Sequence, residues 1–336
     1  MKNFTYYQPT TVEQAVGLLT DKWGPAELLA GGTDLHDLQK EYVAQPETVV
    51  SLNILGGGFR QIRSTRSDPP TITIGAGVKL VDIADDPIVR KYAAALATAA
   101  GMVGGAQIRN MGTLGGNLCQ RNRCWYFRDE HVHCLLKGGN RCYALDGENQ
   151  YHAIFTQGHP CVIVNPSTLA PALIALGATA EIQGPKGRRT FPLANFFNAP
   201  FDDTQREHVL SPNEMVTLVT IPPAAGVASA SYEVRHKQSY DWPLAQACVA
   251  MKLDGGRATN VRVVVGHVAP TPLVSEAAAQ ALEGKAVTEE TAAAAGEAAC
   301  QGARPLAQNG YKVKLLATAV KRAALTAAGA RKYWEA

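Results

Sequence analysis

The sequence of 336 residues lacks the long apolar runs and charge blocks that assign many chains to a class at once. No run reaches the roughly 18 apolar residues of a membrane-spanning helix, and the first residues, MKNFTYYQPTTVEQ, lack the apolar core of a secretion signal. The 32 Lys and Arg residues are scattered and the net charge is +3, so nothing indicates nucleic-acid binding. We expect a soluble, intracellular protein of two or three domains.

The motifs of several enzyme classes are missing too. The chain has no P-loop, no HExxH zinc motif and no arrangement of serine, histidine and acid, so hydrolytic chemistry has no local support. The cysteines form neither C-x2-C pairs nor the C-x2-C-x2-C run of bacterial ferredoxins. We predict no catalytic residue in this chain.

Two glycine-rich turns are present. The first, Gly31 to Asp34, follows a short apolar strand, and the second runs from Gly112 to Asn117. Glycine lets backbone N–H groups approach an anion closely, so the two turns suit the two sides of a dinucleotide diphosphate. Neither turn is the GxGxxG of a Rossmann fold, which argues against that mode of binding. For the first turn alone, an ordinary strand-to-helix connection capped by Thr33 or Asp34 is an equal alternative.

Five of the seven cysteines are crowded between residues 119 and 161. They are Cys119, Cys124, Cys134, Cys142 and Cys161. Without a secretion signal, such crowding favours metal ligation or redox work over structural disulfides. Four thiolates suffice for an iron-sulfur cluster, and zinc stays open. The cations between them are expected to lower the pKa of the thiols; they are Arg121, Arg123, Arg128, Lys137 and Arg141. His131 and His133 are interpreted as exposed loop residues.

The hydrophobic patterns predict an α+β fold. The predicted strands of the first two thirds are 27–30, 47–52, 71–77, 161–164, 178–183 and 215–221. The predicted helices are 11–21, a segment from Pro87 to Gly101, and 168–176. After the prolines at 222 and 223, three strands and the helical segments 273–283, 288–302 and 308–330 are expected. Lys237 and Asp241, at the end of the first of these strands, either face a ligand or belong to a solvated strand end.

The segments LLAGGTDL (28–35), QIRNMGTLGGNL (107–118), LSPNEMVTLVTIP and YEVRHKQSYDW resemble the FAD-binding medium subunit of the molybdenum hydroxylases. This is the family of xanthine dehydrogenase, carbon monoxide dehydrogenase and aldehyde oxidoreductase, and the likeness covers essentially the whole chain. It implies a vanillyl-alcohol-oxidase-like (PCMH-type) FAD-binding domain at 1–223, in two subdomains of about 1–55 and 56–223 with an iron-sulfur loop at about 118–162. A C-terminal domain at 224–336, with a three-stranded antiparallel sheet and helices, is implied as well.

The resemblance also implies site residues, position by position. The implied FAD contacts are Leu29, Ala30, Gly31, Gly32, Thr33, Asp34, Leu35, Gly104, Gly112, Thr113, Gly115, Gly116, Asn117 and Lys237. At Thr168, relatives often carry an aspartate near the flavin. The cysteine segments resemble the branch with an extra [4Fe-4S] cluster, as in 4-hydroxybenzoyl-CoA reductase. That likeness assigns Cys124, Cys134, Cys142 and Cys161 as cluster ligands and leaves Cys119 as the spare.

The implied function is an FAD- and [4Fe-4S]-binding electron-transfer subunit of a heteromeric oxidoreductase. It would pass electrons between a small [2Fe-2S] subunit and an external acceptor, while a large molybdopterin-binding subunit holds the molybdenum cofactor. A self-sufficient FAD-dependent oxidoreductase and a zinc-stabilised binding protein without enzyme activity are the alternatives. A cytoplasmic location is expected, or a periplasmic one if a signal-bearing partner exports the chain.

Overall fold

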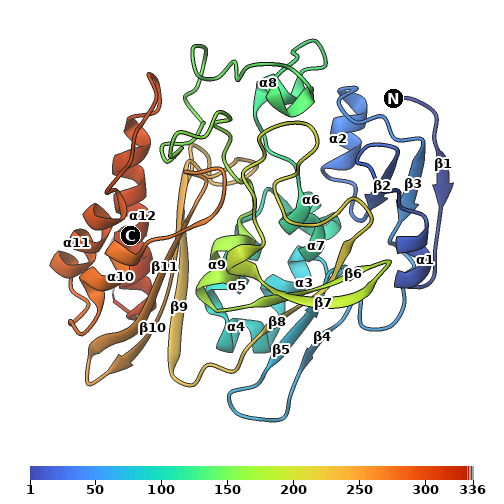
Figure 1. Cartoon of the computed structure of the whole chain (residues 1–336). Helices are drawn as coiled ribbons and strands as arrows, with labels where there is room; N and C mark the ends of the chain where they lie inside the picture. The colour runs from blue at the N-terminus through green and yellow to red at the C-terminus, as the bar shows by residue number, and fades with distance from the viewer. Residues whose placement is uncertain (331, 333, 335–336) are drawn as a thin grey trace.

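The N-terminal part is a small parallel sheet. The computed structural model describes residues 1–330, 332 and 334, and the first sheet in it has the order β1-β3-β2 (Figure 1). Its strands are β1 (Thr5–Tyr7), β2 (Ala26–Leu29) and β3 (Thr48–Ser51), and its helices are α1 (Val12–Gly17) and α2 (Leu35–Lys40). A capping box of Thr11 and Gln14 starts α1, and the helix ends at Gly17, earlier than the predicted 11–21. The first glycine turn lies between β2 and α2.

The second sheet is antiparallel, with the order β4-β5-β8-β6-β7. Its strands are β4 (Ile62–Ser64), β5 (Ile72–Gly75), β6 (Thr179–Gly184), β7 (Gly187–Pro192) and β8 (Met215–Ile221). The helices of this part are α3 (Leu80–Asp85), α4 (Pro87–Tyr92), α5 (Ala94–Met102), α6 (Ala106–Met111), α7 (Leu114–Cys119), α9 (Leu169–Ala175) and the 3-10 turn η2 (Leu193–Asn195). One hydrophobic core joins this sheet, its helices and the N-terminal sheet.

Two predictions in this part need correction. The helix expected from Pro87 to Gly101 is broken at Ala93, where the backbone leaves the helical region and the Ala95 amide donates to Ser229 Oγ at 3.2 Å. The strand expected at 161–164 is absent from the sheets of the described residues. Its Val162 carbonyl instead accepts from the amide of Ala153 at 3.0 Å, because the preceding loop folds back beside it.

The C-terminal part is a second antiparallel sheet, with the order β12-β11-β10-β9. Its strands are β9 (Val227–Val234), β10 (Ala245–Asp254), β11 (Arg257–Gly266) and β12 (Leu273–Val274). The helices α10 (Glu276–Leu282), α11 (Glu289–Ala299) and α12 (Tyr311–Ala327) lie together on one side of it (Figure 1). A tight turn joins β10 and β11 into a hairpin, with Gly255 and Gly256 both at positive φ. The sheet has four strands, where three were predicted, because β12 adds a short edge pairing to β11.

The cysteine loop, residues 118–162, contains little regular structure beyond the end of α7. Its elements are α8 (Trp125–Arg128) and the 3-10 turn η1 (Leu135–Lys137). In Figure 1 it crosses the upper side of the molecule, from α2 toward the C-terminal helices. It forms a small hydrophobic cluster of its own, which includes Phe127, Leu136 and the buried Cys134 and Cys161.

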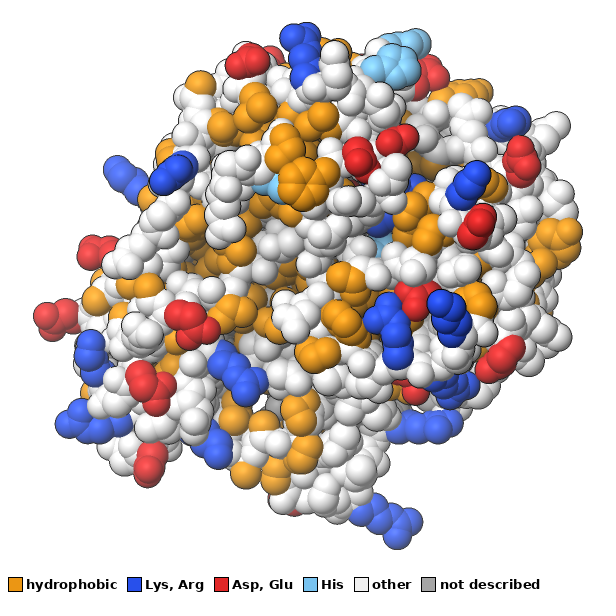
Figure 2. Space-filling model, in the orientation of Figure 1, with side chains coloured by type: hydrophobic (Ala, Val, Ile, Leu, Met, Phe, Trp, Pro, Cys, Tyr) orange, Lys and Arg blue, Asp and Glu red, His pale blue; other side chains and the backbone are white. Residues whose placement is uncertain are grey.

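The face of the molecule that is turned to the viewer in Figure 2 carries charges of both signs. Figure 2 shows Lys and Arg side chains spread around this face and interleaved with Asp and Glu. None of the described helices combines the length and the apolar character that crossing a membrane requires.

Candidate functional site

The two predicted glycine turns touch each other. A Cβ on Gly31 would lie 2.0 Å from the carbonyl oxygen of Met111 and 2.6 Å from its carbon, so this position excludes every side chain. Gly32 follows with φ of +73°, a conformation that glycine adopts without strain. The turn after β2 is therefore seated on the end of α6, directly before the second turn.

A cavity of about 910 Å³ opens where the turns meet. Twelve of the predicted FAD contacts line it: Ala30, Gly31, Gly32, Thr33, Asp34, Leu35, Gly104, Gly112, Thr113, Gly115, Gly116 and Asn117. The other two, Leu29 and Lys237, are not among its lining residues: Leu29 is buried in β2, and Lys237 is exposed in the turn after β9. Thr168 lies in the wall, is buried, and accepts from Gln246 Nε2 through its carbonyl.

The turns differ in the hydrogen bonds that they offer. The amides of the second turn already have protein acceptors: those of Leu114 and Gly115 donate to the carbonyls of Val78 and Ala76, and that of Asn117 donates to the carbonyl of Thr113. By contrast, no hydrogen bond within the described residues uses the amides of Gly31, Gly32 or Thr33. Free amides at a glycine turn are the donors that a diphosphate requires. The donor set of the first turn therefore fits a dinucleotide.

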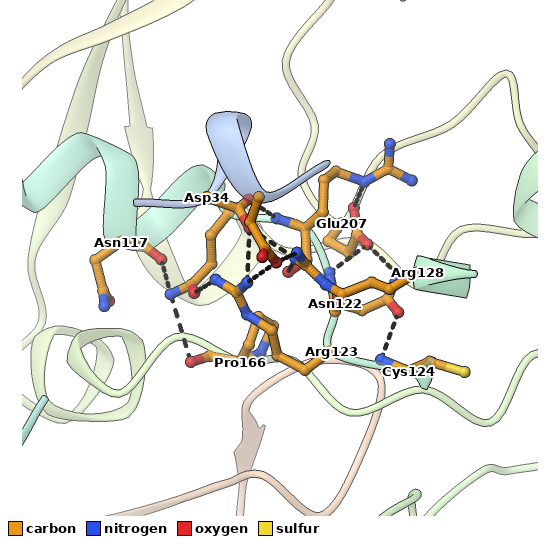
Figure 3. Close-up of polar contacts among 11 residues, drawn as sticks. Asp34, Asn117, Asn122, Arg123, Cys124, Arg128, Pro166 and Glu207 are labelled. Atoms are coloured by element: carbon orange, nitrogen blue, oxygen red, sulfur yellow. Dashed lines mark hydrogen bonds and ion pairs between the residues drawn. The ribbon is translucent and has the colours of Figure 1, made fainter. Parts of the chain in front are cut away.

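The Asp34 carboxylate bonds to three arginines at the start of the cysteine loop. It accepts from the amide of Arg121 at 2.8 Å and from Arg128 Nη2 at 2.6 Å, and it pairs with Arg123 Nη1 at 2.8 Å (Figure 3). Asp37, one helical turn later, pairs with Arg128 Nη1 at 2.6 Å. The side chain of a predicted FAD contact thus fixes the start of the cysteine loop.

Glu207 holds the same segment from the other side. Its Oε1 accepts from both the amide and Nδ2 of Asn122, at 3.0 and 2.7 Å, and its Oε2 lies 2.8 Å from Arg121 Nε (Figure 3). Burial by itself would raise the pKa of Glu207, but Arg121 and the Asn122 donors outweigh burial and hold that pKa below its usual range. The buried carboxylate is therefore charged and depends on Arg121.

These pairings overturn one prediction. The cations were expected to lower the pKa of the thiols, yet Arg121, Arg123 and Arg128 are taken by carboxylates. Arg141 lies 4.3 Å from the centre of the Tyr143 ring. Burial consequently dominates: it raises the pKa of Cys124 to about 12 and also raises that of Cys134, although Lys137 partly opposes the shift at Cys134.

The four predicted cluster ligands share one neighbourhood. A hydrogen bond from Cys161 lowers the pKa of Cys142 to about 6, and Cys142 and Cys134 both act on the pKa of Cys124. Cys119 differs, since burial alone raises its pKa to about 12. Among the described residues, however, no group of three or more His, Cys, Asp or Glu side chains stands close enough to hold a metal ion. The thiols are neighbours without being assembled into a metal site.

One residue beside the thiols was missed from the sequence. His152 Nε2 lies 3.2 Å from Cys124 Sγ, whereas His131 and His133, which flank Cys134 in the sequence, are exposed. Cys124 and His152 are 28 residues apart and share no motif. No local signal could have paired them.

The turn after β9 closes the cavity from the C-terminal part. Its Tyr240, Asp241 and Trp242 line the cavity, and the Tyr240 hydroxyl bonds to Gln107. The Tyr240 ring fills the space that a Cβ on Gly105 would need, at 2.2 Å. Asp241 Oδ2 accepts from the amide of Lys237 at 3.0 Å, so it shapes the turn itself. Sequence reasoning missed Tyr240 and Trp242, because exposed aromatics in a loop carry no pattern.

Comparison with known families covers nearly the whole chain. The family model described as the FAD binding domain in molybdopterin dehydrogenase matches residues 2–224. The model described as the CO dehydrogenase flavoprotein C-terminal domain matches residues 230–327.

Similar proteins agree with these matches. The aldehyde oxidoreductase FAD-binding subunit of Escherichia coli K12 is 34% identical over 318 residues, covering 94% of this chain and 95% of its own. The carbon monoxide dehydrogenase medium chain of Hydrogenophaga pseudoflava is 31% identical over 333 residues, covering 98% of each. A solved structure of carbon monoxide dehydrogenase from Hydrogenophaga pseudoflava, lacking the Mo-pyranopterin moiety of its cofactor, superposes with a TM-score of 0.75 over 97% of both chains at 31% identity.

Proposed function

The chain belongs to the family of FAD-binding medium subunits of the molybdenum hydroxylases, and we propose that it is the electron-transfer subunit of such an enzyme. It would pass electrons between a small [2Fe-2S] subunit and an external acceptor. A large molybdopterin-binding subunit would carry the molybdenum cofactor and oxidise an aldehyde or an aromatic or N-heterocyclic substrate. Matches to subunits and medium chains of oxidoreductases over almost their full length support this role.

The contact between the glycine turns is the observation that carries FAD binding. It creates a cavity whose first wall presents the free amides of Gly31, Gly32 and Thr33, and whose second wall is the braced turn Gly112 to Asn117. In this proposal the amides bind the diphosphate, and Tyr240 and Trp242 cover the ligand. Bound FAD supplies electron transfer in steps of one or two electrons. Leu29 and Lys237 stay predicted contacts outside the cavity lining.

We also propose that Cys124, Cys134, Cys142 and Cys161 hold a [4Fe-4S] cluster. Four thiols fit the ligand set of such a cluster, and these four influence one another's pKa while Cys119 does not take part. The apolar side chains of Phe127, Leu136 and Ile163 form a hydrophobic cluster with Cys134 and Cys161, and Cys124 packs against it. A bound cluster would supply one-electron transfer close to the FAD. The division into FAD-binding subdomains of about 1–55 and 56–223 and a C-terminal domain at 224–336 is part of the same proposal.

The test is the cofactor content of the purified full chain. We expect a flavin absorbance band and about four irons per chain, as a four-thiolate cubane requires. Cys161→Ser should lose the iron and keep the flavin. The matched variant Cys119→Ser, which removes a half-buried thiol outside the set, should keep both. A chain that contains neither flavin nor iron contradicts the proposal, and loss of iron from Cys119→Ser alone reverses the ligand assignment.

A further inference from the structure

We propose that Arg123 is a positioning residue for FAD binding, whose guanidinium fixes the Trp242 ring over the cavity and so slows the release of FAD. The inference rests on the proposed FAD site and adds to it a residue of the cysteine loop that was predicted neither as an FAD contact nor as a cluster ligand. Arg123 is suited to this role because three walls of the cavity are joined through its side chain.

Two of its contacts join Arg123 to the glycine turns. The Arg123 Nη1 atom pairs at 2.8 Å with Oδ1 of Asp34, the last residue of the first turn (Figure 3). The Nη2 atom donates to Gln120 Oε1 at 2.8 Å. Gln120 is the C-cap of α7, and its Nε2 donates to the carbonyl of Asn117, at the end of the second turn, at 2.9 Å. The guanidinium is therefore bonded to the first turn directly and to the second turn through Gln120.

A third contact joins Arg123 to the turn after β9. The Arg123 Cζ atom lies 4.5 Å from the centre of the Trp242 ring, within the range of a cation–π contact, and both side chains line the cavity. Burial lowers the pKa of Arg123 to about 10, while Asp34 opposes this shift, so the guanidinium is charged at neutral pH. Because its planar group is held in one orientation by Asp34 and Gln120, it presents a fixed face to the ring.

The two aromatic residues of this turn are held in different ways. Tyr240 is hydrogen-bonded, because its hydroxyl bonds to Gln107 and its amide donates to the carbonyl of Gly104 at 3.3 Å. The Trp242 residue is 41% exposed, and no hydrogen bond between described residues involves its indole N–H, so its ring relies on packing against Arg123.

The experiment measures how fast FAD leaves the purified full chain, with released FAD separated by rapid gel filtration. Arg123→Lys keeps a positive charge beside Asp34 but loses the planar face against Trp242, and FAD should dissociate about tenfold faster, as expected for one partly desolvated cation–π contact. Trp242→Leu removes the ring and should have the same effect. Trp242→Phe keeps an aromatic ring and should stay within about twofold of the wild-type rate.

Two further variants separate positioning from direct contact with FAD. The double variant Arg123→Lys/Trp242→Leu should release FAD no faster than Trp242→Leu alone, because Arg123 acts through the ring and the two effects are not independent. Arg141→Lys is the matched control: this arginine of the same loop is exposed, lies outside the cavity lining, and has its Cζ 4.3 Å from the centre of the Tyr143 ring. Its replacement should leave the rate unchanged.

The outcomes distinguish this inference from the proposed function. A wild-type chain that binds no FAD contradicts the proposed function, and the inference is lost with it. Where the wild-type chain binds FAD, an unchanged rate in Arg123→Lys overturns the role of Arg123 alone. Effects that multiply in the double variant also overturn it and make Arg123 a direct FAD contact. If Arg123→Lys does not fold, Arg123→Met replaces it in the same comparisons, since Asp34 keeps its pairing with Arg128.

Discussion

The glycine turns and the cysteine loop lie side by side, and they are held in place by different kinds of contact. At the turns, backbone rests on backbone: Gly31 lies against the Met111 carbonyl, and the amides of the second turn are bonded to neighbouring strands and helices. Steric exclusion and main-chain hydrogen bonds do this work, and neither depends on charge.

The cysteine loop is held by side chains from distant parts of the sequence. Glu207 and Asp34 fix its beginning, and Lys312 and Asn309 fix its end. A loop anchored in this way is sensitive to the loss of a single carboxylate or amine, whereas the turns are sensitive to a single added methyl group. From this difference we expect the two proposed cofactor sites to be separable by mutation.

The largest expected effect is at the anchor of the loop. Glu207→Ala leaves the Arg121 guanidinium buried without its counter-charge, and breaking a buried pair in this way should lower the free energy of unfolding by about 3–5 kcal/mol. Urea unfolding of the purified chain measures the loss, and iron content should fall before flavin content does.

The matched control is Glu214→Ala. This carboxylate pairs with Arg189, whose side chain is 39% exposed, so solvent screening limits the loss to below about 1 kcal/mol. Equal losses in the Glu207 and Glu214 variants would show that burial of the Arg121 pair does not matter.

A methyl group at the glycine turn should have the next largest effect. Gly31→Ala forces the turn away from Met111, which should cost about 2–3 kcal/mol of folding free energy and abolish the flavin band while iron is retained. Gly17→Ala is the control, since a Cβ there meets nothing within 4 Å and a helical alanine adds up to about 1 kcal/mol. If the Gly31→Ala protein binds flavin normally, the close contact between Gly31 and the Met111 backbone is not required for the FAD site.

The smallest effect is the response to acid, which should be shared by both regions. Burial lowers the pKa of His208, in the cavity wall, and of His152, in the loop, to about 4 in each case. The unfolded chain, with a histidine pKa of about 6.5, then binds protons that the folded chain does not, so stability falls as pH drops from about 6.5 toward 4.

By about pH 5.5 each of these histidines should have cost about 1 kcal/mol relative to neutral pH. Burial also lowers the pKa of a third histidine, His267, to about 3. Unfolding curves at the two pH values measure the loss, and His208→Phe and His152→Gln should each remove about a third of it. A wild-type chain that is equally stable at both pH values contradicts the assignment of neutral, buried rings.

Features that depend on neighbours in sequence could be predicted. The strand Met215–Ile221 is found with its predicted bounds, because a β-branched run ends at two prolines. The turns at Gly31 and Gly112 could be predicted as a pair, because clustered glycines mark close approach of the backbone.

Features that depend on distant pairing could not be predicted. Arg121 and Glu207 are ordinary charged residues until the fold buries them together, and the two residues of β12 become a strand only by lying at the edge of β11. The burial of the Lys312 amine against three backbone carbonyls could not be predicted from the sequence, because a lysine in an amphipathic helix is normally solvated.

The fastening of the cysteine loop to α12 also sets an order of events during synthesis. All four proposed ligands leave the ribosome well before Asn309 and Lys312 have been added to the chain. During that interval residues 149–153 lack their bonds to Gln308, Asn309 and Lys312, so the thiols of the proposed cluster ligands are held less firmly than in the finished chain. Completion of α12 is thus the step that closes the loop, and a chain truncated before Asn309 would carry its cysteines on an unfastened segment.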